Sequence, residues 1–559
     1  MENIRFLLIT GFFVTLFLLY QAWQADYGKQ TPGPAAPQTT GSTAVPGSDA
    51  SDKPEIPGTA TQDRRPAVAR QDAVATPAQS ANTVTVKTDN YRLHIDPHGA
   101  GIVKVELLKY PVSVDTPDQP FVLMDRSEEL LYITQGGLLS KEEAPTHKSE
   151  FKTDQDEYQL GNNQKTLDVP FYWSSGNITV KKIFEFQRDN YQVHVHYEIT
   201  NNGQSPWAGQ SYIQLKRDKP KKKKGFGSGR YTFTGAVISS PEKRYKKISF
   251  KDIDEEELNE DIVNGWAAMI QHYFVTALVP AEKTASYHYY TMAQTDGNYA
   301  IGMVTPSVSV GPGETRAIDE SMYLGPAVQK DLEQVADGLE LTVDYGKLWF
   351  IAKPLFWCLS KLHGLTHNWG WSIILVTVFL KLVFYPLSAA GYRSMAKMKK
   401  VQPRLTAIRE RYQDDKTRQN QAMMQLYKEE KINPLGGCLP IVIQIPVFLA
   451  FYYMLLESVE MRQAGFIFWL HDLSSPDPYY ILPVLMGITM FIGQKLNPAP
   501  PDPIQAKVMS FLPLIFTVVF AALQSGLVLY YFVNNVLSIC QQWLITRQLE
   551  QSGLKPKST

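Results

Sequence analysis

The sequence has little cysteine and no surplus charge of either sign. Three cysteines occur in 559 residues, Cys358, Cys438 and Cys540. A disulfide-stapled ectodomain is excluded because the first 357 residues have none, and no cysteine or histidine spacing matches a metal site. Lys plus Arg and Asp plus Glu both number 55, which argues against a strongly basic nucleic-acid-binding protein.

Motifs of enzymatic chemistry are also missing. The sequence has no phosphate-binding loop, no GxSxG elbow and no metal-binding triad. We therefore expect a protein that is not an enzyme, with no catalytic residue, metal or cofactor.

The first 80 residues predict an anchor and a tether. Arg5 precedes an apolar run over residues 6–20, which fits either a cleavable signal or a retained transmembrane anchor. Bulky Trp23 in the best cleavage-like stretch favours an anchor over residues 1–25. Residues 26–80, rich in Pro, Ala, Thr, Gln, Gly and Ser, predict a disordered tether.

Residues 81–340 predict an all-β domain. Segments such as NITVKKIFEFQ and YQVHVHYEITNNG alternate apolar and polar side chains, which is typical of half-buried strands in a large antiparallel sandwich. The lysine run at residues 219–224 has no aromatic platform beside it and predicts a solvated loop rather than a nucleic-acid site. His194 and His196 share one strand face, but without a third ligand we interpret them as ordinary strand residues.

The last third predicts a polytopic α-helical membrane protein. Residues 341–366 combine aromatic side chains with Lys353, Pro354 and Lys361, which indicates a helix in the bilayer interface. Five apolar segments follow that are mostly near the length of about 20 residues needed to span a bilayer. With the anchor they make about six spans, the last five at residues 367–391, 434–456, 479–496, 508–524 and 525–545.

Charge in the connecting loops predicts the orientation. Basic residues outnumber acidic ones in residues 392–433, so this loop should be cytoplasmic, as should residues 497–507 and the basic tail at 546–559. The acidic loop 457–478 and the β-domain then lie outside, and both termini lie inside.

Residues 392–433 predict an antiparallel helical hairpin with a break at residues 413–415. Met395, Met398, Met423 and Met424 predict an adaptable contact face, although a simple surface helix pair fits the sequence equally well.

Lys381 is an isolated charge inside the segment WSIILVTVFLKLVFYPL. A lysine near the bilayer centre costs about 2.5–3.5 kcal/mol, so it needs compensation. The other C-terminal spans contain no Asp, Glu or His, which favours water as its partner and disfavours a proton-coupled transporter. Snorkelling of Lys381 to an interface is the alternative. The polar residues that could line the same cavity are Thr377, Gln444, Tyr530, Tyr531, Asn534 and Asn535.

Three segments closely resemble the YidC family of membrane protein insertases, of the Gram-negative type with a large periplasmic domain, and the match extends over essentially the whole chain. The segments are NPLGGCLPIVIQIPVFLAFYYML (433–455), DPYYILPVLMGITMFIGQK (477–495) and SGLVLYYFVNN (525–535). The resemblance implies a bacterial inner-membrane protein with a periplasmic supersandwich. It also implies a five-helix core around a hydrophilic groove open to cytoplasm and lipid.

The resemblance further implies a groove charge, usually arginine, at the position of Lys381. Thr377, Gln444, Tyr530 and Tyr531 would line the groove. Lysine keeps the charge but lacks the planar guanidinium fork. The implied function is insertion and folding of membrane proteins, alone or with the Sec translocon. Implied partners are nascent membrane proteins, membrane lipids, and ribosomes or targeting factors at the hairpin and tail. A carbohydrate-binding or envelope-assembly protein anchored by its spans is the alternative, because large β-sandwiches often bind sugars.

Overall fold

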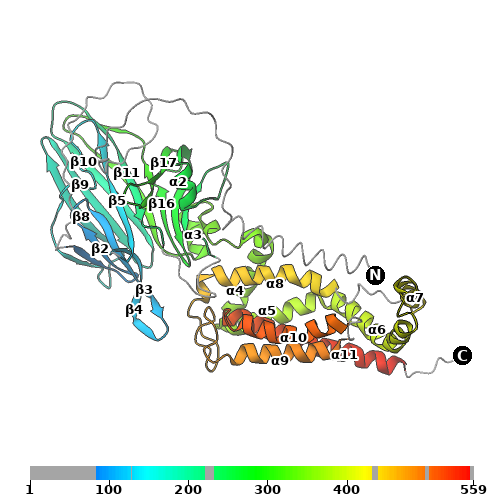
Figure 1. Ribbon diagram of the computed structural model, residues 1–559. Coiled ribbons are helices and arrows are strands. Elements are labelled where there is room, and N and C mark those ends of the chain that lie inside the picture. The colour runs from blue at the N-terminus through cyan, green and yellow to red at the C-terminus, as the bar shows by residue number, and fades with distance from the viewer. Residues whose placement is uncertain (1–82, 128, 221–231, 431–438, 498–502, 554–559) are drawn as a thin grey trace, which may run out of the picture. The chain divides into compact units, whose positions relative to one another are not determined.

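The computed structural model describes residues 83–127, 129–220, 232–430, 439–497 and 503–553 (Figure 1). The predicted anchor, the tether and most of the lysine run lie outside these residues. Residues 394–430 belong to a separate compact unit.

The predicted β-sandwich is confirmed, and it consists of two sheets that share one hydrophobic core. Antiparallel pairing dominates, although β1 and β7 pair in parallel. The first sheet contains β14 (Asn259–Val263), β17 (Ser286–Ala293), β18 (Tyr299–Val304), β11 (Trp207–Arg217), β5 (Leu131–Ser140), β4 (Thr116–Arg126), β3 (Gly101–Ser113), β2 (Tyr91–Asp96), β1 (Val84–Lys87) and β7 (Glu157–Gln159), with β19 (Val308–Val310) beside β11. The second contains β13 (Lys246–Ile248), β12 (Gly235–Ser239), β15 (Trp266–Gln271), β16 (Phe274–Pro280), β20 (Thr315–Pro326), β10 (Gln192–Asn201), β9 (Ile178–Gln187), β8 (Thr166–Ser175) and β6 (Lys152–Thr153).

The alternating segments fold as their pattern predicts. On β10, Val193, Val195 and Tyr197 are buried, while His194 and His196 point to the other face. Register places His196 opposite Asp319 on β20 and His194 opposite Glu185 on β9. Burial of every second side chain provides the hydrophobic stabilisation that holds the sheets together.

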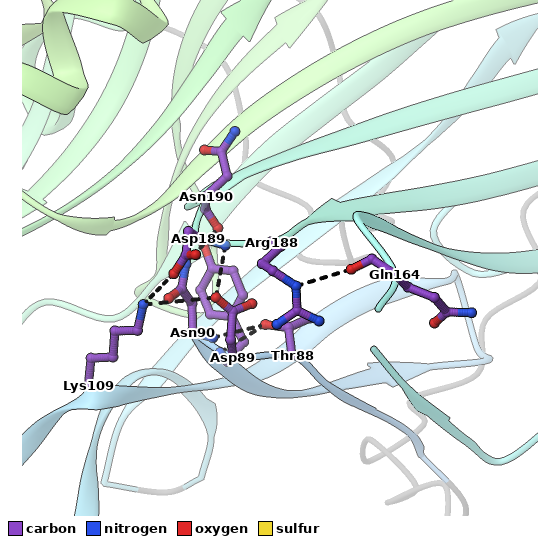
Figure 2. Close-up of polar contacts among 9 residues, drawn as sticks. Thr88, Asp89, Asn90, Lys109, Gln164, Arg188, Asp189 and Asn190 are labelled. Carbon is purple, nitrogen blue, oxygen red and sulfur yellow. Dashed lines mark hydrogen bonds and ion pairs between the residues drawn. The ribbon is translucent and has the colours of Figure 1, made fainter. Parts of the chain in front are cut away.

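The β1–β2 loop of the first sheet and the β9–β10 loop of the second connect the two sheets at one end of the sandwich (Figure 2). In the β1–β2 loop, Asp89 accepts a hydrogen bond from the Asp189 amide (2.8 Å), and Asn90 donates to the Asn190 carbonyl (3.0 Å). Lys109 bridges the same place by donating to the Asp189 carboxylate (2.9 Å). Each loop thereby satisfies polar groups of the other, which makes this cluster a structural connection.

Two short helices, α2 (Phe250–Glu255) and α3 (Gln329–Val335), accompany the sandwich. The C-terminal region is helical, as predicted. Helix α11 packs against α5, α8 and α9, and α4 packs against α5 and α8. The helices are α4 (Trp349–Thr366), α5 (Trp369–Val383), α6 (Tyr385–Arg411), α7 (Lys416–Glu429), α8 (Leu439–Glu457), α9 (Ile481–Leu496), α10 (Pro503–Phe520) and α11 (Ser525–Gly553).

The first predicted core span is a bent pair of helices. Helices α5 and α6 meet at Phe384 with an angle of 67°. Pro386 lacks the amide hydrogen that would bond to the Leu382 carbonyl, and its ring would clash with that carbonyl in a continuous helix, so α5 ends before it. Within the described residues this pair has the length and apolar character of a span, and no single helix has both. Val442–Glu457, Ile481–Leu496 and Lys507–Phe520 are apolar but shorter.

Residues 394–430 form the predicted helical hairpin, with the break where the sequence placed it. Helix α6 ends at Arg411, and Asp415 caps α7 by accepting hydrogen bonds from the Thr417 and Arg418 amides (3.1 and 2.9 Å). Arg404 on α6 pairs with Glu430 after α7 (2.7 Å).

Met423, one of the four methionines of the predicted contact face, is not available for contact. Met423 is buried in the seam between the helices with Val401, Leu405 and Leu426, and Met398 packs against this core. Of the four methionines, Met395 is half-buried and only Met424 is exposed. The helical repeat turned these flexible apolar side chains toward the partner helix, where they fill the seam.

Candidate functional site

Lys381 lies in the last turn of α5. Asn368 begins this helix by accepting a hydrogen bond from the Trp371 amide (3.1 Å). One face of α5 is exposed, with Trp371, Phe379 and Leu382 on it. Lys381 belongs to the opposite face and is only 9% exposed. The lysine is therefore held inside the helical region rather than extended along its surface.

The ammonium of Lys381 has a protein partner that the sequence did not predict. Its Nζ donates to Oγ of Ser538 on α11 (2.7 Å). Ser538 in turn donates to the Asn534 carbonyl one turn earlier (2.7 Å). No acidic side chain lies within ion-pair distance of Lys381 among the described residues, as expected from the lack of acids in the spans. The positive charge is thus buried and uncompensated.

A pocket adjoins the lysine, with walls from α5, α6, α8 and α11. Its central space is about 30 Å³, enough for one or two water molecules. The walls mix hydroxyl, amide and apolar groups, which lets water or a polar chain segment enter. Lining residues are Thr377, Leu380, Lys381, Phe384, Leu387, Ser388, Ile443, Gln444, Val447, Tyr530 and Asn534.

Four of the five residues predicted for the site meet at this pocket. Gln444 and Tyr530 join α8 to α11 through a side-chain hydrogen bond. The Thr377 hydroxyl donates to the Ile373 carbonyl of its own helix (2.7 Å). Its oxygen therefore makes the pocket wall more polar but has no proton left to donate to a ligand. Tyr531 is absent from the lining and instead packs its ring against Phe448 and Phe520, with ring centres 5.5 and 5.1 Å away.

Ser538 and Ser388 are not predicted as site residues from the sequence. Serine in an apolar helix attracts no notice, because its hydroxyl can bond to the preceding turn at little cost. The signal that could have found Ser538 is its spacing, four residues after Asn534, which puts both on one face of α11.

His196 on β10 is paired with two carboxylates. His196 Nδ1 contacts Asp319 (2.7 Å) and its Nε2 contacts Glu185 (3.3 Å), while His194 stacks beside it with ring centres 6.4 Å apart. Among the described residues no group of three or more His, Cys, Asp or Glu side chains is placed to hold a metal ion. The two carboxylates serve His196 as ion-pair partners.

The His196 pairs predict a small pH dependence of stability. Burial lowers the pKa of His196, but the hydrogen bonds and charges of Asp319 and Glu185 outweigh it and raise the pKa above its usual value. This stabilisation is complete below the unfolded pKa of about 6.5 and is lost as pH rises through the raised folded value. We expect His196→Gln to lower the melting temperature at about pH 6 and to change it little at about pH 9. An equal loss at both values would contradict the charge effect.

Comparisons with known proteins cover both regions. Residues 83–358 match the family model described as YidC periplasmic domain, and residues 361–552 match the 60Kd inner membrane protein model. The membrane protein insertase YidC of Nitrosococcus oceani is 45% identical over 99% of this chain and 100% of its own length. That of Stutzerimonas stutzeri is 45% identical, with 100% of each chain covered.

The chain belongs to the YidC family of membrane protein insertases. Its β-sandwich is therefore the periplasmic domain of that family, and its helical C-terminal region is the 60Kd inner membrane protein domain. A solved structure of an active YidC insertase with its first transmembrane domain resolved matches at 19% identity. It covers 83% of this chain and 92% of its own, with a TM-score of 0.39. The full-length relationship favours an insertase over the carbohydrate-binding or envelope-assembly alternative.

Proposed function

We propose that this chain inserts membrane proteins into the bacterial inner membrane and assists their folding, using the pocket around Lys381 as a polar entry site. The observation that carries this proposal is the uncompensated Lys381 ammonium beside a pocket between apolar helices. A buried cation is costly, and a polar, hydrated cavity is the setting in which membrane proteins retain one.

We place five core spans in the membrane, formed by the α5–α6 pair, α8, α9, α10 and α11, with an N-terminal anchor before them. The exposed side of α10 supports this placement, because Phe511, Leu514 and Val518 are 60%, 63% and 67% exposed. Hydrocarbon is the environment that such a face favours. The basic loop at residues 392–433 supports a cytoplasmic hairpin and two cytoplasmic termini.

The proposed mechanism uses charge attraction and a thinned barrier. An incoming protein presents an apolar segment and a short, often acidic, extracytoplasmic tail. Water in the pocket shortens the apolar path that this tail must cross, and the Lys381 ammonium attracts its carboxylates. The apolar segment then leaves sideways into lipid, and burial of about 20 apolar residues supplies the driving force without nucleotide hydrolysis. Lys381, Thr377, Gln444 and Tyr530 act as a binding surface, and no covalent step occurs.

We propose three further partners from the family resemblance. The Sec translocon would work beside the core spans, lipids would surround them, and ribosomes or targeting factors would deliver substrates to the hairpin and basic tail. Among the described residues of the hairpin, Met424 on α7 is an exposed large apolar side chain that is available for such contact.

Reconstitution tests the proposed function. The purified chain in liposomes, without nucleotide, should insert a single-span substrate with an acidic tail so that the tail becomes protected from external protease. Empty liposomes give the background. Protection no greater than this background would refute the insertase proposal for this chain.

Deletion of the predicted tether is expected to have little effect on insertion. Deletion of most of residues 26–80 should leave insertion in the same liposomes within about two-fold of wild type, because a disordered linker contributes reach rather than contacts. Complete loss of insertion would show that the segment contains a binding site.

A further inference from the structure

The Ser538 hydroxyl contacts the Lys381 ammonium as a neutral acceptor whose orientation is fixed by its own hydrogen bonds. A serine hydroxyl has one proton to donate and two lone pairs to accept with. The proton of Ser538 goes to the Asn534 carbonyl (2.7 Å), so its oxygen presents lone pairs to its other neighbours. One is used by Lys381 Nζ (2.7 Å). These two hydrogen bonds hold the Ser538 hydroxyl between Lys381 and the preceding turn of α11.

The ammonium is not saturated. It has three N–H groups, and Ser538 is its hydrogen-bond partner among the described residues. Lys381 also lines the pocket, together with the amides of Gln444 and Asn534. The hydrogen bond to Ser538 on α11 thus fixes one N–H of the ammonium and leaves the other two to water or to a ligand in the pocket.

The partner is neutral, and this determines what the charge can do. A carboxylate at this position would form a charge-assisted ion pair and cancel the positive field in the pocket. A hydroxyl dipole orients the ammonium but leaves its net charge in place. This combination suits attraction of an anionic group that arrives from outside.

We infer that Ser538 is a positioning residue that sets the preference of the pocket for substrates with acidic tails, by holding Lys381 in place without neutralising it. This inference rests on the proposed function and adds Ser538 as a positioning residue of that site.

The test compares two substrates in liposomes that contain the full chain. One is a single-span protein with an acidic tail, and the other has the same tail with each Asp and Glu changed to the corresponding amide. Ser538→Asp should lower insertion of the acidic-tailed substrate about ten-fold or more, the size of one lost charge-assisted interaction, and should leave the amide-tailed substrate within about two-fold. Asn535→Asp is the matched control, because it adds the same charge to α11 where the side chain reaches Thr489 on α9 (3.5 Å).

Two milder variants separate positioning from charge. Ser538→Ala removes the hydrogen bond to Lys381 and should raise the half-saturating concentration of the acidic-tailed substrate, with little change in the maximal rate. Ser538→Thr keeps the hydroxyl and should restore the wild-type value.

Equal losses for both substrates in Ser538→Asp, or an undiminished preference for acidic tails, would overturn the assigned role. Lys381→Glu distinguishes a failure of the Ser538 role from a failure of the groove-charge proposal. If it is inactive while Ser538→Asp keeps the preference, only the role of Ser538 fails, whereas full activity of Lys381→Glu refutes the groove-charge proposal itself.

Discussion

Lys381→Glu should abolish insertion of an acidic-tailed substrate. The substitution replaces attraction by repulsion inside a buried pocket, where a single charge contact at about 4 Å is worth about 4 kcal/mol at an effective dielectric constant of 20. Insertion should therefore fall more than about a hundred-fold, measured as the protease-protected fraction in liposomes. The expected effect is large because no acidic side chain pairs with Lys381 among the described residues. An existing ion pair would already have cancelled its field.

Lys381→Arg is the control that keeps the charge. The guanidinium retains donors for Ser538 Oγ and should preserve insertion. Both variants must be reconstituted at the same level and melt at the wild-type temperature, so that a folding defect is separated from a site defect. Normal insertion by the Glu variant would remove the charge from the mechanism.

Asp477→Ala should destabilise the connection between α8 and α9. Asp477 is only 1% exposed, and its carboxylate accepts hydrogen bonds from the Trp469 indole (3.0 Å) and from the amides of Tyr479 (3.0 Å) and Leu482 (2.7 Å). Alanine leaves all three donors without their partner. Because each unsatisfied buried donor costs about 1–3 kcal/mol, we expect a loss of about 2–4 kcal/mol after partial access of water.

The measurement is the melting temperature of the full chain in detergent, together with the rate of proteolysis within residues 459–480. Asp477→Asn keeps the shape and one acceptor oxygen, so it should lie between wild type and Asp477→Ala. An Ala variant as stable and as protease-resistant as wild type would show that the carboxylate does not hold this loop.

The period of each segment predicted which elements form, but it could not predict their partners. Alternation in the segments that became β9 and β10 gave two strands and their buried faces correctly. The parallel pairing of β1 with β7 depends on contacts between segments about 70 residues apart, which no local pattern encodes. Likewise, Arg462 in the loop after α8 donates to the Pro111 carbonyl in the β3–β4 hairpin (2.6 Å), across 351 positions of sequence.

The candidate site divides in the same way. Lys381 is evident from sequence because a charge in an apolar run is costly, and Gln444 and Tyr530 stand out as polar groups in other runs. Ser538 does not, since its hydroxyl is satisfied by its own helix. Tyr531 was predicted beside Tyr530, but adjacent residues on a helix point about 100° apart, and it turns toward Phe448 and Phe520 instead. Met423 shows the converse error, because an apolar residue in a polar helix can face a partner helix as readily as a substrate.

Site-specific photocrosslinking tests most directly whether the pocket receives the incoming chain. A photoreactive residue is placed at position 377, 444 or 530, at 531, and at 518 on the exposed face of α10 as the control. Ribosome-bound nascent chains of an acidic-tailed membrane protein are then irradiated with the full chain in inner-membrane vesicles. We expect crosslinks to the tail from 377, 444 and 530 that exceed those from 531 and 518 and disappear in Lys381→Glu. Tail crosslinks confined to 518, or unchanged in Lys381→Glu, would contradict this expectation.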